Sequence, residues 1–337
     1  MDYRLLGKTG FVVSFLGLGG LPLQRIPEKE AVRIVELCLD RGLNFIDTAR
    51  SYGDSEQKIG KAVSGKRDKV VLASKSRVTS YQEMRQEIER SLAAFATDYL
   101  DLYQCHNINT KDRLEQIMAP GGALEALTDA KKEGKIRAIG FSGHRLGLAL
   151  EAVRCGCFET VQVPYNFIER AAQEELFPLA RRLNLGTIVM KPLAGGAFSR
   201  PDLAMRFLAD KEVSVLIPGM DQTEQVEENY ALVRERKPLN EEEVAYLTRE
   251  AEAIGDCFCR RCEYCNPCPQ GIDITACIAS YGYYHRYGMK EWACELYAKM
   301  AVKADACVRC GLCETRCPYS LPIREILQKA HQDLGQR

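Results

Sequence analysis

Short apolar runs alternate with amphipathic stretches through about the first 250 residues of the chain. Runs such as 70–73 (Val-Val-Leu-Ala) are apolar at consecutive positions, which is typical of strands buried on both faces of a parallel sheet. Eight such runs can be identified. The predicted strands are 15–20, 44–48, 69–75, 99–106, 136–142, 160–165, 187–192 and 213–218.

Helical patterns fill the segments between the predicted strands. Residues 28–41 and 81–95 repeat their apolar positions every three or four residues, as a helix with one buried face does. Glycines stand where four helices should end before the next strand, at Gly42, Gly134, Gly156 and Gly186. Eight strand–helix units in about 250 residues predict an α/β fold, a closed (β/α)8 TIM barrel. An open doubly wound sheet is the alternative.

The two ends of the chain depart from this alternation. Residues 3–15 place Gly7-Lys8-Thr9-Gly10 between apolar runs, which predicts a β-hairpin that caps one end of the barrel. Near the C-terminus, two cysteine-rich loops at 256–271 and 306–318 enclose a helical stretch, and a last helix is expected near 323–334. We therefore expect two domains, a barrel over 1–256 and a small α-helical domain over 257–337.

Charge and composition exclude several classes of function. The chain has 337 residues, with 46 Lys and Arg against 46 Asp and Glu, so the formal net charge is zero. Such a balance lacks the basic surface that nucleic acid or acidic membrane attracts. No apolar run approaches the roughly 20 residues of a membrane span, and no secretory signal follows the first residues. We expect a cytoplasmic protein with neither nucleic-acid nor membrane partners.

Cysteines are concentrated in the C-terminal part, which holds 11 of the 15 in the chain. Clustered cysteines in a protein of the reducing cytosol bind metal more often than they form disulfides. The second run, Cys307-x2-Cys310-x2-Cys313-x3-Cys317-Pro318, has the spacing of a bacterial ferredoxin. An earlier run has the same spacing except for one residue fewer in its last gap, and consists of Cys259, Cys262, Cys265 and Cys268 before Pro269.

In two-cluster ferredoxins the cysteine before proline binds the other cluster. Cluster one would then have the ligands Cys259, Cys262, Cys265 and Cys317. Cluster two would have the ligands Cys307, Cys310, Cys313 and Cys268. The helical stretch between the runs resembles an α-helical two-cluster ferredoxin. Structural zinc, which also uses Cys-x2-Cys pairs, is the alternative, and Cys257 is an alternative ligand.

Four ionisable residues follow three consecutive predicted strands. Asp47 and Tyr52 come after the second strand, Lys75 ends the third and His106 ends the fourth. The chemistry of a barrel enzyme takes place at these strand ends. An ammonium group lowers the pKa of a neighbouring phenol, which is about 10 when unperturbed, so a tyrosine beside a lysine can donate a proton to a carbonyl oxygen. Singly, these residues could equally form a plain ion pair, a buried core histidine and a loop aromatic.

Several segments carry these residues in the order found in the aldo-keto reductases, which the sequence resembles over about residues 1–250. The segments are 16–19 (Leu-Gly-Leu-Gly), 47–56 (Asp-Thr-Ala-Arg-Ser-Tyr-Gly-Asp-Ser-Glu), 73–75 (Ala-Ser-Lys), 101–106 (Asp-Leu-Tyr-Gln-Cys-His) and 139–142 (Ile-Gly-Phe-Ser). The resemblance implies a (β/α)8 barrel that reduces carbonyl groups with a nicotinamide cofactor. It also implies that Tyr52 is the proton donor, that Lys75 and Asp47 support it, and that His106 orients the substrate.

The resemblance also implies a set of cofactor contacts. Ser142 and Gln162 match positions that hold the nicotinamide carboxamide, but Gly143 replaces the usual asparagine and Met190 replaces a stacking aromatic. The remaining expected contacts are Lys191 and Leu193 along the pyrophosphate, and Gly219, Gln225, Glu228 and Asn229 towards the adenosine.

One loop bears on the choice between NADH and NADPH. NADPH-preferring relatives place a basic residue near the loop 219–222, where this chain has Asp221. A 2′-phosphate would gain no charge-assisted hydrogen bond from an acid. We therefore expect NAD(H) in preference to NADP(H), unless an arginine from elsewhere makes that contact.

The two parts together allow three hypotheses. The first is a carbonyl oxidoreductase whose two [4Fe–4S] clusters exchange electrons with a small-molecule carbonyl or alcohol substrate or with a redox protein partner. The second is the same reaction with clusters that only brace the C-terminal fold. The third is an electron-transfer or interaction module whose barrel is no longer catalytic. Hydride carries two electrons and each cluster takes one, but no flavin motif is visible to mediate between them.

Overall fold

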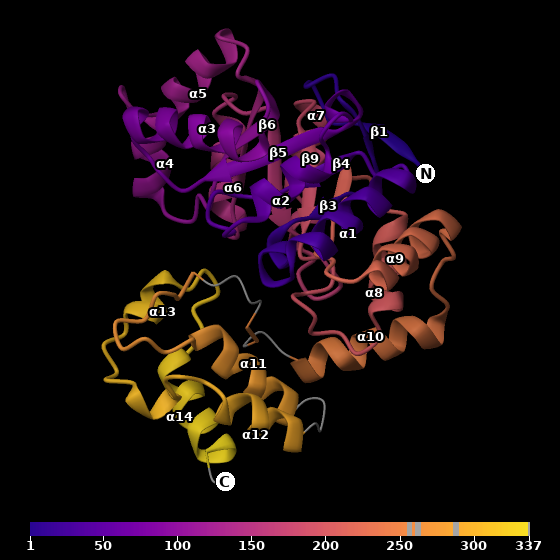
Figure 1. Cartoon of the computed structure of the whole chain (residues 1–337). Coiled ribbons are helices and arrows are strands. Elements are labelled where there is room, and N and C mark those ends of the chain that lie inside the picture. Colours follow the sequence, from indigo (N-terminus) through magenta and orange to yellow (C-terminus); the bar gives the residue numbers. More distant parts are fainter. Residues whose placement is uncertain (255–257, 260–263, 286–289, 336–337) are drawn as a thin grey trace. The chain divides into compact units, whose positions relative to one another are not determined.

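The computed structural model describes residues 1–254, 258–259, 264–285 and 290–335. The predicted boundary at 256/257 and two cysteines named above, Cys257 and Cys262, lie outside these residues. The chain divides into two compact units (Figure 1). The first comprises Met1–Ala194 and Arg200–Leu247, and the second comprises Gly195–Ser199 and Thr248–Arg337.

Eight parallel strands form the centre of the first unit (Figure 1). Each pairs with the next along the chain, and parallel bridges Leu16–Leu216 and Gly19–Gly219 join the last strand to the first. The predicted (β/α)8 barrel is therefore confirmed. The strands are β3 (Leu18–Gly19), β4 (Phe45–Asp47), β5 (Val71–Ser76), β6 (Leu100–Cys105), β7 (Ile136–Ser142), β8 (Thr160–Pro164), β9 (Gly186–Met190) and β10 (Val215–Ile217).

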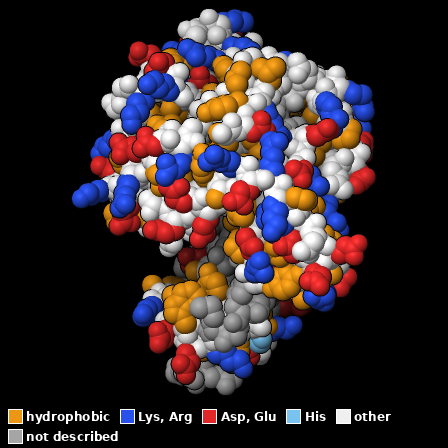
Figure 2. Space-filling view, turned by 90° about the vertical axis from the view of Figure 1, so that its right-hand side faces the viewer, with side chains coloured by type: hydrophobic (Ala, Val, Ile, Leu, Met, Phe, Trp, Pro, Cys, Tyr) orange, Lys and Arg blue, Asp and Glu red, His pale blue; other side chains and the backbone are white. Residues whose placement is uncertain are grey.

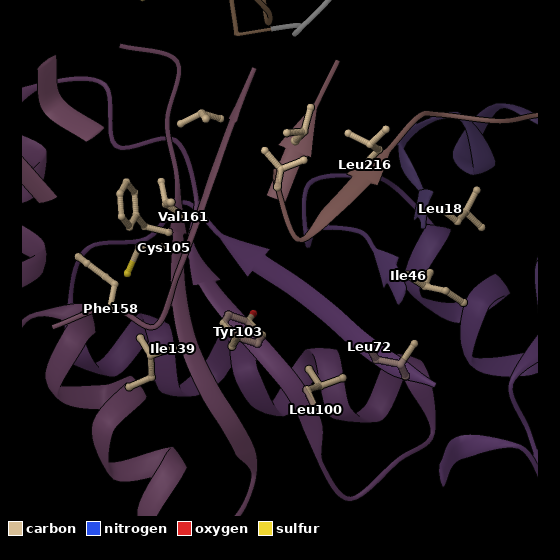
Figure 3. Packing of buried hydrophobic residues seen from close by; sticks show 14 of the residues in the cluster. Leu18, Ile46, Leu72, Leu100, Tyr103, Cys105, Ile139, Phe158, Val161 and Leu216 are labelled. Carbon is tan, nitrogen blue, oxygen red and sulfur yellow. The ribbon is translucent and has the colours of Figure 1, made fainter. Parts of the chain in front are cut away.

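Helices surround these strands and meet their outward-facing side chains. Tyr103, Ile139 and Val161 point outward from β6, β7 and β8 and are buried in the layer between strands and helices (Figure 3). The helices of this unit begin with α1 (Glu28–Asp40), α2 (Ser55–Ala62), α3 (Tyr81–Phe95), α4 (Lys111–Met118) and α5 (Ala123–Lys132). They continue with α6 (Leu146–Arg154), α7 (Leu176–Arg182), α8 (Pro201–Ala209) and α9 (Thr223–Glu235), and α10 (Glu241–Ile254) runs across the unit boundary.

The predicted hairpin closes the bottom of the barrel. Strands β1 (Tyr3–Leu5) and β2 (Val12–Ser14) pair antiparallel. Leu6 and Val13 are fully buried in one cluster with interior side chains of the barrel such as Phe45. This apolar plug fills the N-terminal end, so the polar chemistry is confined to the other end.

Three of the four glycines that were predicted to end helices do so. Gly42, Gly134 and Gly156 have φ values of 80°, 78° and 74°, the left-handed conformation expected after a helix. The prediction for Gly186 is wrong, because the left-handed residue after α7 is Asn184, with φ 52°. Gly186 instead opens β9 beside the hairpin, where a Cβ atom would lie 2.7 Å from the Leu6 side chain.

The second unit is helical, as expected of an α-helical ferredoxin-like domain. It contains α11 (Ile274–His285), α12 (Lys290–Ala298), α13 (Leu312–Arg316) and α14 (Ile323–Leu334). Ile274, Tyr297 and Leu327 belong to a core that also includes several cysteines. Across the described part of the chain, none of the helices has the length and apolarity that crossing a bilayer requires. On the face seen in Figure 2, acidic and basic side chains are interspersed on the larger unit, in line with the balanced charge.

Candidate active site and cysteine pocket

A buried ion pair lies at the C-terminal ends of β4 and β5. Lys75 Nζ is 2.5 Å from Asp47 Oδ2, and the two side chains are 1% and 4% exposed. Lys75 Nζ also donates to the carbonyl oxygen of Thr48 at 2.8 Å. Burial raises the pKa of Asp47 and lowers the pKa of Lys75, while their attraction and hydrogen bonds oppose both shifts. The structure thus brings these two predicted residues into direct contact.

Tyr52 and His106 meet at the same end of the barrel. Their ring centroids are 6.0 Å apart with the rings nearly perpendicular. Lys75 Nζ lies 5.2 Å from the centroid of the Tyr52 ring. Burial and the nearby cationic side chains, Lys75 first among them, hold the pKa of His106 well below 6.5. All four residues predicted from the strand ends therefore converge, and the histidine is neutral at neutral pH.

A second buried charge network anchors the loop that carries Tyr52. The Arg50 N–H donates to the Lys75 carbonyl oxygen at 3.0 Å, and the Arg50 guanidinium pairs with Glu56 at the start of α2. Glu56 Oε1 accepts hydrogen bonds from Ser74 on β5 at 2.6 Å and from Ser91 on α3 at 2.8 Å. The loop is thereby fixed to one strand and two helices.

Gln104 on β6 is a site residue that sequence reasoning missed. Its Nε2 donates to Asp47 Oδ1 at 3.2 Å and to Gln162 Oε1 at 2.8 Å. Gln162 Nε2 in turn lies 3.4 Å from Asp47 Oδ2. A signal was available, because Gln104 stands two residues before His106 on a buried strand and therefore faces the same side.

The expected cofactor residues fall into two groups. Ser142 and Gln162 are neighbours in register on β7 and β8, and the Ser142 hydroxyl accepts from the Asn107 N–H at 3.1 Å. Lys191 and Leu193 follow β9, with Lys191 in the left-handed conformation at φ 55°. The other group lies after β10.

In this second group, Gly219 bridges to Gly19, and Gln225 Oε1 accepts from the Asp221 N–H at 2.9 Å. On α9, Asn229 is buried whereas Glu228 is exposed. This second group therefore follows β10, whereas Ser142 and Gln162 lie on β7 and β8.

Cysteines from both runs of the second unit line one pocket. Its sulfur-bearing residues are Cys265, Cys268, Cys307, Cys310 and Cys313. This set contains all four ligands expected for cluster two, including Cys268 from the other run. Of the ligands expected for cluster one, Cys265 lines this same pocket, Cys317 is buried and Cys259 is half-buried. Among the described residues, no three His, Cys, Asp or Glu side chains are grouped closely enough to hold a single metal ion.

Sequence comparison matches both parts of the chain to known families. The model of the aldo/keto reductase family matches residues 15–203, which is more than half of the chain. The chain belongs to the aldo-keto reductase family. The model of a 4Fe-4S dicluster domain matches residues 258–322, which confirms the expected two-cluster ferredoxin-type domain.

Individual known proteins are similar to this chain over most of the barrel. Aldo-keto reductase YhdN of Bacillus subtilis (strain 168) is 34% identical over 215 residues, 58% of this chain and 63% of that protein. The chain thus matches less than two thirds of that relative's length. L-galactose dehydrogenase of Arabidopsis thaliana is 30% identical over 308 residues, 75% of this chain and 94% of that protein.

Two solved structures are similar in fold. The holo form of an aldo-keto reductase from Bacillus halodurans has a TM-score of 0.65 and 28% identity, covering 75% of this chain and 97% of its own. An aldo-keto reductase from Klebsiella pneumoniae in complex with NADPH has a TM-score of 0.61 and 26% identity, covering 74% of this chain and 95% of its own.

Gly143 and Met190, the two residues that depart from the aldo-keto reductase pattern, each have a close neighbour in the structure. An ideal Cβ on Gly143 would lie 2.9 Å from the Ile108 carbonyl oxygen, so the loop after β6 occupies the room that a side chain would need. Met190 Sδ lies 3.9 Å from Gln162 Nε2 at the end of β9. The altered residues therefore adjoin the pair Ser142 and Gln162.

Proposed function

We propose that the barrel reduces a carbonyl group of a small molecule to an alcohol, or catalyses the reverse reaction, with a nicotinamide cofactor. The observation that supports this most directly is the buried Lys75–Asp47 pair beside Tyr52 and His106. A phenol close to a buried ammonium and a neutral imidazole is an arrangement suited to protonating a carbonyl oxygen. Membership of the aldo-keto reductase family supports the same reaction.

The side chains at the barrel end fit a nicotinamide. The Ser142 hydroxyl accepts one hydrogen bond and keeps its own proton to donate, and Gln162 next to it supplies an amide, so both can hold a carboxamide. A Cβ on Gly219 would lie 2.8 Å from the Pro22 ring, so packing against Pro22 requires glycine at this position. When bound, the nicotinamide supplies or accepts the hydride at the substrate carbon.

The residues of the chain then orient the carbonyl oxygen of the substrate and supply its proton. Tyr52 donates its phenolic proton to the carbonyl oxygen as the alcohol forms. Lys75 stabilises the phenolate that remains, and Asp47 holds the lysine in place through the 2.5 Å contact. His106, kept neutral by burial, donates an N–H to the carbonyl oxygen and orients it.

Replacement of the phenol tests this assignment. Tyr52→Phe should lower kcat for NADH-dependent carbonyl reduction by at least 10²-fold, as loss of a general acid does, and should leave the iron content unchanged. Tyr99→Phe removes the hydroxyl of a half-buried tyrosine at the start of β6, at the other end of the barrel, and should have wild-type activity. Equal turnover in Tyr52→Phe and wild type would refute the assignment.

For the cofactor, we propose NADH over NADPH. Asp221 supports this, because its carboxylate follows Gly219 where a 2′-phosphate would need a cation. The NADPH bound to the Klebsiella relative argues for the other cofactor. A comparison of kcat/KM for the two cofactors decides between them. Asp221→Asn should improve the value for NADPH and leave that for NADH little changed, and a wild-type preference for NADPH would contradict the proposal.

For the second unit, we propose two [4Fe–4S] clusters in a protein that works in the cytoplasm. Cys268, Cys307, Cys310 and Cys313 fit cluster two, because thiolates from both runs face one pocket. Iron and sulfide counts on protein purified without oxygen test the clusters. NADH added without substrate then tests their role, because an EPR signal of reduced clusters indicates electron transfer, and clusters that stay oxidised indicate a bracing role or an external donor.

A further inference from the structure

The rim of the cysteine pocket exposes apolar side chains. Val308 is 62% exposed and Leu312 is 42% exposed, and both line the pocket. Cys310 between them is itself exposed. Large apolar side chains gathered at the surface beside a functional site mark a place where another molecule binds.

Two unpaired cations flank these apolar residues. Arg309 donates to Gln328 Oε1 at 3.0 Å and Arg316 donates to the Pro267 carbonyl oxygen at 3.0 Å, and neither pairs with a carboxylate of the described residues. The nearby carboxylate of Glu314 is neutralised by Arg324 at 2.6 Å. The rim therefore carries positive charge around an apolar centre.

The backbone presents this rim in a fixed shape. Arg309 and Gly311 have φ values of 57° and 80°, which turn the chain so that Val308 and Leu312 lie on either side of Cys310. Arg324 reaches the turn from α14, where its guanidinium lies 3.5 Å from the Arg309 carbonyl oxygen. A surface that is already rigid loses little conformational entropy when a partner binds.

We propose that Val308, Arg309, Leu312 and Arg316 form the docking face for a small acidic protein that carries one electron. An apolar centre with arginine at its edge is the composition of protein–protein interfaces, and complementary charge speeds encounters between weakly bound partners. The docked carrier exchanges one electron with cluster two through the exposed Cys310 side, being oxidised as the cluster is reduced or the reverse, without forming or breaking a bond. This inference rests on the proposed iron–sulfur function.

Binding of an acidic flavodoxin to the full-length holoprotein tests the docking face. Isothermal titration under anaerobic conditions measures Kd at low and at physiological salt. Arg309→Glu/Arg316→Glu should raise Kd more than ten-fold at low salt and flatten its salt dependence. Lys299→Glu/Lys329→Glu changes the net charge equally at exposed residues outside the segment 308–316 that forms the proposed face, and should bind as wild type does.

A separate variant tests the apolar part of the docking face. Leu312→Ser should weaken binding while the salt dependence stays as in wild type. Failure of wild-type holoprotein to bind flavodoxin at low salt, or equal weakening by both double variants, overturns the docking face. Iron content separates this failure from that of the proposed function, because a protein with about eight iron atoms per chain that does not bind retains its clusters and lacks only the docking face.

Discussion

At the scale of single residues, the barrel end depends on Gln104, whose amide joins the ion pair to Gln162. Gln104→Leu keeps the volume but removes both donated hydrogen bonds, one of them to a buried carboxylate. Since a hydrogen bond to a charged group contributes about 1.5–3 kcal/mol, we expect kcat/KM to fall roughly 10- to 100-fold, with a higher KM for NADH. Steady-state kinetics with varied NADH measure both.

A neighbouring interior residue provides the control for Gln104. Thr160 is fully buried on β8, and within the described residues its hydroxyl finds no hydrogen-bond partner. Thr160→Val should therefore leave kcat/KM unchanged and should not lower the free energy of unfolding. Wild-type kinetics in Gln104→Leu would show that Asp47 and Gln162 are positioned without Gln104.

His106 makes stability depend on pH. Its pKa is held well below 6.5 in the folded protein, whereas the unfolded chain binds this proton near pH 6.5. The unfolded state therefore binds more protons below about pH 6.5, and the free energy of unfolding falls by up to about 1.4 kcal/mol for each pH unit of acidification. His106→Asn should remove this contribution. Urea unfolding at pH 7.0 and pH 5.5 measures it, and an identical pH dependence in both proteins would contradict it.

The pattern of apolar runs predicted the polar site residues at strand ends, whereas Gln104 inside a strand was missed. Asp47, Lys75 and His106 are polar at the point where an apolar run stops, and this position places them at one end of a barrel. Gln104 stands within such a run, and only the register of β6 with β5 shows that it lies beside Lys75. The distances that make the site work depend on strand stagger, which no local pattern encodes.

At the scale of elements, the contact between α2 and α3 depends on one glycine. An ideal Cβ on Gly60 of α2 would lie 2.6–2.8 Å from backbone atoms of Phe95 at the end of α3, and a backbone cannot move aside as a side chain can. Gly60→Ala should therefore lower the free energy of unfolding by about 1–3 kcal/mol. It should also reduce kcat, because α2 begins with the residues that anchor the Tyr52 loop.

Another helical glycine gives the opposite expectation. Gly147 lies exposed in α6, and nothing is within 4 Å of the position of its Cβ. Gly147→Ala should raise the free energy of unfolding by about 0.5–1 kcal/mol, because alanine favours the helix and meets no neighbour. Urea denaturation of both variants tests the pair, and a stable Gly60→Ala protein would show that the helices can separate without cost.

The elements themselves followed from periodicity, since each of the eight predicted strands and the helices 28–41 and 81–95 overlap observed ones. The helix ends were less certain, as Gly186 shows. A glycine can serve either a left-handed turn or a close approach, and only the contact of β9 with Leu6 shows that Gly186 serves the second. The local sequence shows where a glycine stands, but its contacts in the folded protein determine whether it ends a helix or allows a close approach.

At the scale of the whole molecule, the cysteine runs link segments far apart in sequence. Cys268 lies in one pocket with Cys307, Cys310 and Cys313, about 40 residues further along the chain. If each run supplies one ligand to the other's cluster, the two clusters tie both loops together. The cluster that Cys268 or Cys317 binds then cannot be identified from the spacing of its own run alone.

Iron counts on combined variants test this exchange. Cys268→Ser and Cys310→Ala should each remove cluster two and halve the iron from about eight to about four atoms per chain. Because both act on one cluster, the double variant should lose no more iron than either single variant. Cys268→Ser/Cys317→Ser should lose nearly all iron, since Cys317 is expected to serve cluster one. Cys294→Ala, a buried position in α12 outside both runs, should keep the full count. Near-complete iron loss in Cys268→Ser/Cys310→Ala would show that each run binds its own cluster, whereas Cys268→Ser/Cys317→Ser removes a ligand from both clusters under either arrangement.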